Sequence, residues 1–241
     1  MKIVVQLITL SLLLLLIDAN QYCDNLVREC NANFKTRCLL NFTINNCCDL
    51  KLFSSPSGIY KLRKGAFDTG NGYCDMDNAE GGWLVIQRNK KDSKVNFSRK
   101  WKDYEEGFGD VKSEFWYGLK QLRCLVERGQ WEMRVDYQTS SKAWAYIHYT
   151  QFSIGSASDE YPLMVGGFTG IGSNTFATSN NMKFTTVDNE NDKWSGGNCA
   201  ARYASGWWFN SCHGINPNQR PPYPSLLFVE MKIRPKNCIT Q

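Results

Sequence analysis

The 241-residue sequence is poor in the residues and motifs that enzymes use. It has two histidines, His148 and His213, and it contains no GxSxG elbow, no HExxH motif and no phosphate-binding P-loop. The glycine-rich run 166–172 lacks the spacing of a dinucleotide-binding loop and is better interpreted as an ordinary loop. Paired carboxylates such as Glu105 and Glu106 are more typical of a solvated face. The sequence therefore predicts a protein that is not an enzyme.

Long runs of charged or apolar residues are also scarce. The net charge is +5 at pH 7, and no run of about five or more Lys or Arg residues occurs, so a nucleic-acid partner is not expected. One apolar run is long. It extends from Ile3 to Ile17, follows Lys2 and precedes the small residue Ala19, which is typical of a cleaved secretory signal. The alternative is a membrane anchor, but the run is short for a span and no basic cluster flanks it. We expect residues 1–19 to be a signal peptide and the mature chain to be secreted, without a membrane span.

The ten cysteines include no CxxC pair, which leaves no support for a zinc ribbon or a thioredoxin-type site. Their even number in a secreted chain predicts disulfide bonds. Sequons at Asn41 and Asn96 are candidate glycosylation sites and agree with secretion. Residues 20–46 lack a Gly-x-y repeat and are too short for a coiled coil, so they are expected to form a cysteine-rich segment tied by disulfides. An odd cysteine in this segment could link the chains of a homo-oligomer.

Residues 47–238 are expected to form one domain of the α+β class, because short helices and antiparallel strands are mixed along the chain. The clearest strand is 131–137, in which apolar and charged side chains alternate. Residues from 187 to 224 are interpreted as loops. Further strands are predicted over 57–62, 72–77, 81–88, 143–152, 161–167 and 226–233. A short helix is predicted over 101–107, and residues 115–119 lead into a helical run through Leu122 and Leu125.

An acidic turn lies inside this loop-rich part. Asp188, Glu190 and Asp192 alternate along the chain and precede two glycines. Alternate carboxylates in an irregular loop can converge on a calcium ion, which binds roughly six to eight oxygens. Taken alone, such a pattern is more often a solvated acidic turn than a metal site. It is not an EF-hand, because Lys193 and Cys199 stand where that loop needs glycine and glutamate.

Cys199 and Cys212 bracket a segment that is rich in aromatic residues. A disulfide between them would restrict the unfolded chain by about 3 kcal/mol and would hold an aromatic surface beside the acidic turn. Trp207 and Trp208 in this segment have a second interpretation, as residues of the hydrophobic core.

A series of short motifs follows one order between Cys47 and Pro235. The motifs are Tyr73-Cys74-Asp75-Met76, Gly81-Gly82-Trp83, Gln87-Arg88, Trp101, Tyr104, Gly107-Phe108-Gly109, Glu114-Phe115-Trp116, Gly118, Arg134-Val135-Asp136, Asn180-Asn181-Met182-Lys183-Phe184, Asp188-Asn189-Glu190-Asn191-Asp192, Asn198-Cys199-Ala200, Gly206-Trp207-Trp208, Cys212-His213 and Met231-Lys232-Ile233-Arg234-Pro235. In this order they resemble the fibrinogen-related domains. The resemblance implies a fibrinogen C-terminal-like fold with an N-terminal subdomain, a central antiparallel sheet flanked by helices, and a loop-rich region that holds calcium and ligand.

The resemblance also implies two disulfides. One joins Cys199 to Cys212. The other joins Cys74 to Cys48, with Cys47 as the alternative partner. Two further cysteines are extra relative to the family and could bridge each other or reach the N-terminal segment: Cys124 and Cys238.

Calcium is the cofactor that the resemblance implies. The family's ligands are two carboxylates followed by two backbone carbonyls, which correspond here to Glu190, Asp192, Trp194 and Gly196. Glu190 stands where aspartate is usual, so its longer side chain must fold back or bind bidentately. An extra glycine lengthens the turn before Asn198.

In ficolin- and tachylectin-like members the ligand lies beside the disulfide that corresponds to Cys199–Cys212. There, a cis peptide before the second cysteine turns backbone N–H groups toward an acetyl oxygen, and aromatic rings hold the methyl group. The corresponding residues here are Tyr203, Phe209, Ser211, Cys212 and His213. For His213, a structural hydrogen bond that fixes the loop is the alternative role.

The loop after Asn218 is shorter than in these members, where a longer loop supplies further aromatic walls. Tyr223 could replace one wall; otherwise the pocket is open on one side. Two function classes therefore remain. The first is a secreted lectin-like protein of innate immune recognition, which binds N-acetylated glycans and gains avidity as an oligomer. The second is an extracellular protein-binding, matrix or signalling module in which calcium is only structural and no sugar binds.

Overall fold

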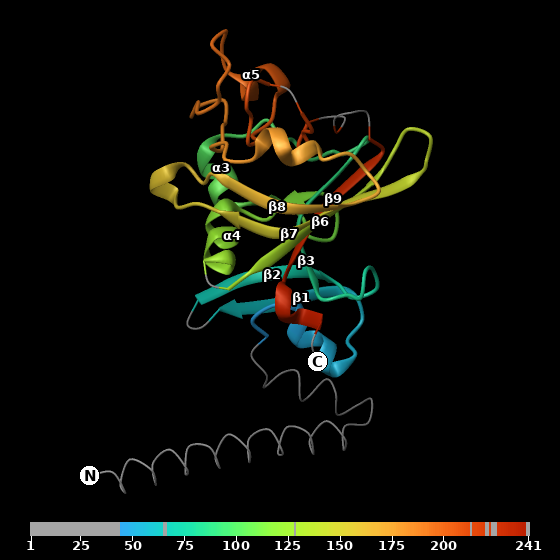
Figure 1. The fold of residues 1–241 in the computed structure, drawn as a ribbon. Helices are drawn as coiled ribbons and strands as arrows, with labels where there is room; N and C mark the ends of the chain where they lie inside the picture. The colour runs from blue at the N-terminus through green and yellow to red at the C-terminus, as the bar shows by residue number, and fades with distance from the viewer. Residues whose placement is uncertain are drawn as a thin grey trace, which may run out of the picture. The chain divides into compact units, whose positions relative to one another are not determined.

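A computed structural model describes residues 44–64, 67–127, 129–212, 214–219, 222 and 226–239 (Figure 1). The predicted signal peptide, the sequon at Asn41, and the residues His213 and Tyr223 lie outside the described residues. Contacts group Ile44 and the residues after it into one compact unit. Within the described ranges, no helix combines the length and the apolar character that a membrane span requires.

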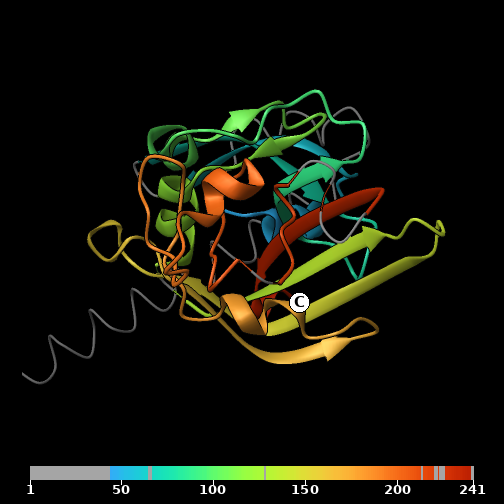
Figure 2. The ribbon, with the colours of Figure 1, turned by 90° about the horizontal axis from the view of Figure 1, so that it is seen from above.

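The scaffold is an antiparallel sheet of nine strands within the described residues. The strands are β1 Gly58–Lys64, β2 Phe67–Asp75, β3 Trp83–Lys90, β4 Phe108–Gly109, β5 Phe115–Trp116, β6 Trp131–Gln138, β7 Trp144–Ile154, β8 Leu163–Gly170 and β9 Phe228–Pro235. The main order is β1-β2-β3-β9-β6-β7-β8, and β5 pairs with β3 and β4. The last strand of the chain therefore lies between β3 and β6, as Figure 2 shows in red. The predicted strands and the α+β class are confirmed, with strand ends that differ by a few residues.

The helices are short, and several begin at an asparagine. The side chain of Asn46 accepts a hydrogen bond from the N–H of Cys48, and that of Asn198 accepts one from the N–H of Ala201. The helices predicted over 101–107 and through 125 are confirmed, whereas those at 47 and 199 were too short to give a periodic pattern. The helices are η1 Cys47–Phe53, α3 Trp101–Glu106, α4 Leu119–Val126, η2 Ala157–Asp159, η3 Thr175–Ser179, α5 Cys199–Tyr203 and η4 Lys236–Ile239.

The two central strands β6 and β9 have one apolar face and one charged face, because side chains alternate along a strand. On the apolar face, Met133 of β6 and Met231 of β9 are fully buried. On the other face, Glu132, Lys232 and Arg234 are also buried. The alternation in 131–137 therefore separates the two faces correctly, but the charged face is covered by ion pairs rather than by water.

The pairing predicted for Cys48 is wrong. The structure joins Cys47 to Cys74 and Cys48 to Cys238. Cys47 and Cys48 are neighbours in η1, and successive residues of a 3₁₀-helix point about 120° apart. The buried Cys47 side chain faces β2, whereas that of Cys48 faces η4 at the C-terminal end. Among the described cysteines, Cys124 of α4 is free and half-buried.

Candidate functional site

The loop-rich region that holds the predicted site surrounds α5, at one end of the sheet (Figure 1). Thr185 and Trp207 form an antiparallel bridge, in which each N–H donates to the carbonyl of the other residue at 2.9 and 3.1 Å. The N–H of Lys193 donates to the carbonyl of Asn210 at 2.6 Å. These bonds connect the acidic turn to the aromatic segment that follows it.

A pocket of about 160 Å³ lies beside the disulfide that joins Cys199 to Cys212. The ring of Tyr203, at the end of α5, stacks on that of Phe209, with ring centres 6.1 Å apart and 22° between the ring planes. Cys212 lines the pocket in the left-handed backbone conformation, with φ of 65°. The structure thus brings together three of the predicted ligand-binding residues. The remaining wall consists of Gly214, Ile215, Asn216 and Gln219, which the sequence did not indicate.

The other predicted residues are placed differently, and one neighbour was missed. Ser211 is half-buried and is not among the residues that line this pocket, and His213 lies outside the described residues. The exposed Arg202 has its guanidinium carbon 5.4 Å from the ring centre of Trp194 and 5.9 Å from that of Tyr203. It brings a positive charge between the acidic turn and the pocket. Arg202 could have been found from the sequence, because it directly precedes Tyr203.

Buried amides of β3 fix the short wall that follows the disulfide. The Gln87 amide donates to the carbonyl of Pro217 and to Oδ1 of Asn218, at 3.1 and 3.2 Å. The Asn89 amide donates to the carbonyls of Pro217 and Gln219, at 2.9 and 3.0 Å. Both amide side chains are fully buried. Despite its shortness, this wall therefore has a defined conformation.

The paired tryptophans belong to the core, which confirms their second interpretation. Trp207 and Trp208 are 1% and 0% exposed, and the indole N–H of Trp208 donates to the carbonyl of Tyr161 at 2.7 Å. The hydroxyl of Tyr104 accepts the N–H of Gly206 at 2.8 Å, and burial raises the pKa of Tyr104 well above its ordinary value. A Cβ at Gly206 would lie 2.6 Å from the Tyr104 ring, so the aromatic core requires glycine at this position.

Two backbone N–H groups hold the carboxylate of Asp192 in the acidic turn. Its Oδ1 accepts the N–H of Trp194 and its Oδ2 accepts the N–H of Cys199, both at 2.9 Å. The second bond reaches the first residue of α5, and Tyr203 is the last residue of that helix. Glu190 is exposed, and no described residue forms a hydrogen bond or ion pair with its side chain.

Asp188 has a structural role in the same turn. Its Oδ1 accepts the N–H of Trp101 and the hydroxyl of Thr186, each at 2.8 Å. Burial opposes ionisation, but these hydrogen bonds hold the pKa of Asp188 below its ordinary value. Asp188 therefore ties the acidic turn to α3.

The predicted calcium ligands form a set of oxygen donors only. They are the carboxylates of Glu190 and Asp192 and the carbonyls of Trp194 and Gly196. This chemistry fits calcium, and Asp192 is already oriented by two N–H groups. The described residues include no group of three or more acidic, histidine or cysteine side chains that could hold a metal, so the carbonyls would be needed as ligands. Calcium binding remains a prediction.

Comparison with known proteins supports one family. Residues 45–225 match the family model described as fibrinogen beta and gamma chains, C-terminal globular domain. The chain is similar to Fibrinogen C domain-containing protein 1 of Mus musculus, with 36% identity over 215 residues. That match covers 78% of this chain and 46% of the relative, so the chain spans about half the length of this relative.

Solved structures agree with the family match. The fibrinogen-like globe domain of human ANGPTL6 is 31% identical, with a TM-score of 0.75, and the match covers 80% of this chain and 96% of that domain. The lamprey fibrin D-dimer, complexed with the peptide ligand Gly-His-Arg-Pro-amide, is 27% identical, with a TM-score of 0.72. That match covers 97% of this chain and 85% of the other chain. The resemblance seen in the sequence motifs is confirmed.

Proposed function

Because the chain belongs to the family of the fibrinogen C-terminal globular domain, we propose that it is a secreted, lectin-like recognition protein that binds N-acetylated carbohydrates. The observation that carries this proposal is the stacked pair of Tyr203 and Phe209 beside the disulfide of Cys199 and Cys212. The role is binding rather than catalysis. It belongs to innate immune recognition outside the cell.

The size of the Tyr203 pocket favours a small chemical group over a whole sugar ring. Its volume of about 160 Å³ is below the range of about 300–1,000 Å³ that is common for sites enclosing a drug-sized ligand. An N-acetyl group matches the lining, because its methyl group can pack on the rings of Tyr203 and Phe209. Its carbonyl oxygen can accept backbone N–H groups near Cys212. The sugar ring would then lie outside the pocket.

Calcium is part of the proposal, with Glu190, Asp192 and the carbonyls of Trp194 and Gly196 as ligands. Bound calcium supplies positive charge that holds the acidic turn in one conformation. The hydrogen bond from the Cys199 N–H to Asp192 connects that turn to the start of α5. Fixing Asp192 would therefore also fix Tyr203 at the other end of the helix.

Secretion and glycosylation also belong to the proposal. Asn96 is exposed, and its Oδ1 accepts the N–H of Ser98 at 2.9 Å, so the sequon lies in a surface turn that is accessible to a glycan. Homo-oligomers would raise the avidity of a weak single site for a surface that repeats the same sugar.

A second candidate function is an extracellular protein-binding module. It is favoured by the similarity to the lamprey fibrin D-dimer, which is complexed with a peptide ligand. A larger groove on the charged face of the sheet gives this candidate a possible binding surface of its own.

Retention of the secreted protein on N-acetylglucosamine resin tests the first candidate. We expect retention in calcium, elution by free N-acetylglucosamine or acetate, and loss of retention in EDTA. Tyr203→Ala should abolish retention, because it removes one ring of the stacked pair, whereas Tyr203→Phe should keep the ring and most of the binding. A folded, calcium-loaded protein that no acetylated resin retains would exclude the lectin function.

A further inference from the structure

Strands of the sheet line two concave sites that share no residue with the Tyr203 pocket. The first, the sheet groove, has a volume of about 660 Å³ and is lined by β2, β3, β6, β7 and β9 and the turn after β2. The second, which we call the amide pocket, has a volume of about 530 Å³ and is lined by residues 129–131, 150–153 and 164–165, with Asn180, Asn181 and Lys236. Both volumes are typical of ligand-binding clefts.

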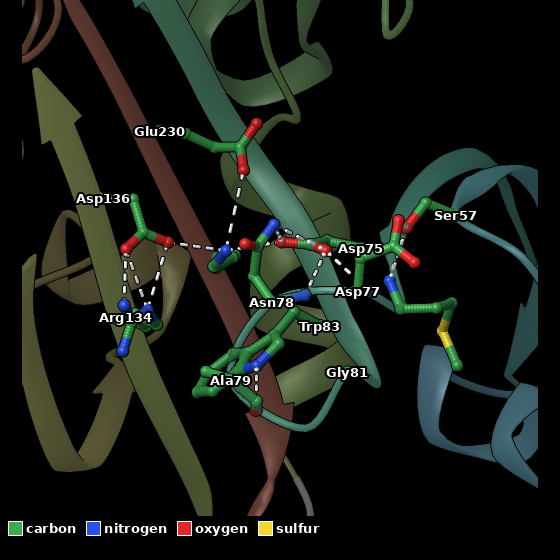
Figure 3. Close-up of polar contacts among 12 residues, drawn as sticks. Ser57, Asp75, Asp77, Asn78, Ala79, Gly81, Trp83, Arg134, Asp136 and Glu230 are labelled. Atoms are coloured by element: carbon green, nitrogen blue, oxygen red, sulfur yellow. Dashed lines mark hydrogen bonds and ion pairs between the residues drawn. The ribbon is translucent and has the colours of Figure 1, made fainter. Parts of the chain in front are cut away.

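Ion pairs between strands fill the floor of the sheet groove (Figure 3). The Nζ of Lys232 lies 2.5 Å from Oδ2 of Asp75 and 2.6 Å from Oδ2 of Asp136. The Nε of Arg88 lies 2.7 Å from Oε2 of Glu230. The charged side chains of this groove are therefore largely used within the chain.

The polar side chains of the amide pocket are not used in this way. Six of them form no hydrogen bond or ion pair with any described residue: Gln130, Thr150, Gln151, Ser153, Asn181 and Lys236. Five of the six are carboxamides or hydroxyls. Among the described residues that line the pocket, Lys236 alone is charged. The pocket therefore offers uncharged hydrogen-bonding groups to a ligand.

A β-bulge turns three of these side chains to the same side of the sheet. The register of β6 and β7 shifts here, so that Thr150 and Gln151 of β7 stand opposite one residue of β6. The buried side chains of β7 occupy odd positions before the bulge and even positions after it, as in Ile147, Tyr149, Phe152 and Ile154. Thr150, Gln151 and Ser153 therefore all point away from the core.

Two glycines of β8 leave room for the side chains of the bulge. A Cβ at Gly166 would lie 2.6 Å from Oε1 of Gln151, and a Cβ at Gly167 would overlap Oγ1 of Thr150. The side chains of Gln151 and Thr150 therefore lie over β8, in the middle of the amide pocket.

The two ends of the amide pocket are held by hydrogen bonds of the backbone. At one end, the N–H of Lys236 donates to the carbonyl of Gln130 at 2.9 Å. At the other end, Oδ1 of Asn180 accepts the N–H of Val165 at 2.9 Å, so the NH₂ group of this amide is left for a ligand. Neighbouring strands lie about 4.8 Å apart, so roughly 10 Å separates β6 from β8, and Asn180 lies beyond β8. A single sugar ring therefore cannot meet both ends, whereas a short chain of rings can.

We propose that the amide pocket binds an uncharged, unacetylated oligosaccharide that lies across the strands. A sugar hydroxyl both donates and accepts hydrogen bonds, and so do the carboxamides and hydroxyls of this pocket. Trp131 and Phe152 are 7% and 4% exposed, so hydrogen bonds rather than ring stacking would hold the sugar. Met164, which is 40% exposed, offers an apolar surface to one ring. This site does not depend on the function proposed for the Tyr203 pocket.

Ligand-observed NMR titration of the secreted full chain with three glucose trisaccharides tests this inference. The probes are laminaritriose, cellotriose and maltotriose, which differ in linkage and carry neither a charge nor an acetyl group. At least one should bind, and its affinity should not fall as salt is raised, because no ion pair forms. Gln151→Ala and Asn181→Ala should each weaken binding about two- to tenfold, because each removes a hydrogen-bonding side chain. Both side chains are exposed, so the fold should persist.

Asn71→Ala is the matched control, because it removes the same carboxamide from an exposed residue of β2 outside the amide pocket. It should leave the affinity for the trisaccharide unchanged, as should Tyr203→Ala and saturating N-acetylglucosamine. Binding of none of the three probes, equal effects of Asn181→Ala and Asn71→Ala, or loss of binding in Tyr203→Ala would overturn the inference. So would binding of trigalacturonic acid alone that Lys236→Gln removes, since the pocket would then be an anion site.

Discussion

The Tyr203 pocket and the sheet groove hold their polar groups in different ways. In the sheet groove the partners are far apart in sequence, as in the pair of Lys232 and Asp75, which are 157 residues apart. In the acidic turn beside the pocket the partners are close, as in the bond between Asp192 and Cys199, which are 7 residues apart. The strand register determines the sheet groove, whereas a disulfide and local turns determine the acidic turn and the start of α5.

This difference determines which charges a ligand can meet. In the sheet groove, cationic side chains pair with Asp75, Asp136 and Glu230, so most of the carboxylates are neutralised. In the acidic turn, neutral backbone N–H groups hold Asp192, and its negative charge is retained. The acidic turn therefore keeps the negative charge that the proposed calcium site needs, whereas most of the charge in the sheet groove is neutralised.

The largest expected effect comes from breaking the centre of the sheet groove. Lys232→Met should lower the free energy of unfolding by about 3–5 kcal/mol, because it leaves the buried Asp75 without its cation. Urea unfolding of the secreted protein measures this loss. The double variant Asp75→Asn with Lys232→Met should recover most of it, because no buried charge is then left unpaired.

Lys102→Met is the matched control for that change. Lys102 is exposed and lies 4.0 Å from Glu106, so its loss should cost less than about 0.5 kcal/mol. If Lys232→Met and Lys102→Met lowered the free energy of unfolding by the same small amount, the ion pairs of the charged face would not stabilise the fold.

A smaller effect is expected in the acidic turn. Asp192→Asn replaces one acceptor oxygen by an amide and should leave an N–H group without a partner, either that of Trp194 or that of the buried Cys199. The free energy of unfolding should fall by about 1–3 kcal/mol. Calcium should raise the melting temperature of the wild type but not of this variant.

Asp188→Asn separates the loss of a hydrogen bond from the loss of calcium. It weakens the bonds to Trp101 and Thr186 but removes no predicted ligand, so the variant should still be stabilised by calcium. If calcium still stabilised Asp192→Asn but no longer stabilised Asp188→Asn, Asp188 rather than Asp192 would be the calcium ligand, and the predicted ligand set would be wrong.

The contrast between the two regions also explains what the sequence could predict. The strand at 131–137 was clear because apolar and charged residues alternate, and this depends only on neighbours in the chain. The partners of Glu132 and Asp136 on other strands could not be predicted, because they come from β7 and β9. The pairing of Cys47 and Cys48 failed for a similar reason, since it depends on how η1 is oriented on β2 and η4.

The candidate site was predicted in part. Tyr203, Phe209 and Cys212 follow from the family motifs, and they do line one pocket. The family motifs did not predict the pocket wall after Cys212. Buried amides of Gln87 and Asn89 in β3, roughly 130 residues away in the sequence, hold this wall. The sheet groove was not predicted at all, since it exists only once the strands are in register.

The smallest expected effect is a pH dependence within the sheet groove. Burial raises the pKa of Glu230 above 4.5, although Arg88 and Lys232 oppose this shift. The folded protein then binds a proton that the unfolded chain has already lost. The contribution of Glu230 to stability is therefore fully present below pH 4.5 and is lost as the pH rises through its raised pKa.

Glu230→Gln carries no charge at any pH and removes this dependence. Relative to the variant, the wild type should lose about 1 kcal/mol of unfolding free energy as the pH rises from about 4.5 to about 7. Urea unfolding at several pH values measures the difference, with the exposed Glu127→Gln as the control. The groups whose pKa is lowered, such as Asp75, act in the opposite direction at lower pH, so the comparison starts above their range. A difference that stays constant with pH would mean that Glu230 has the same pKa in the folded and the unfolded chain, which would contradict the expected effect of burial.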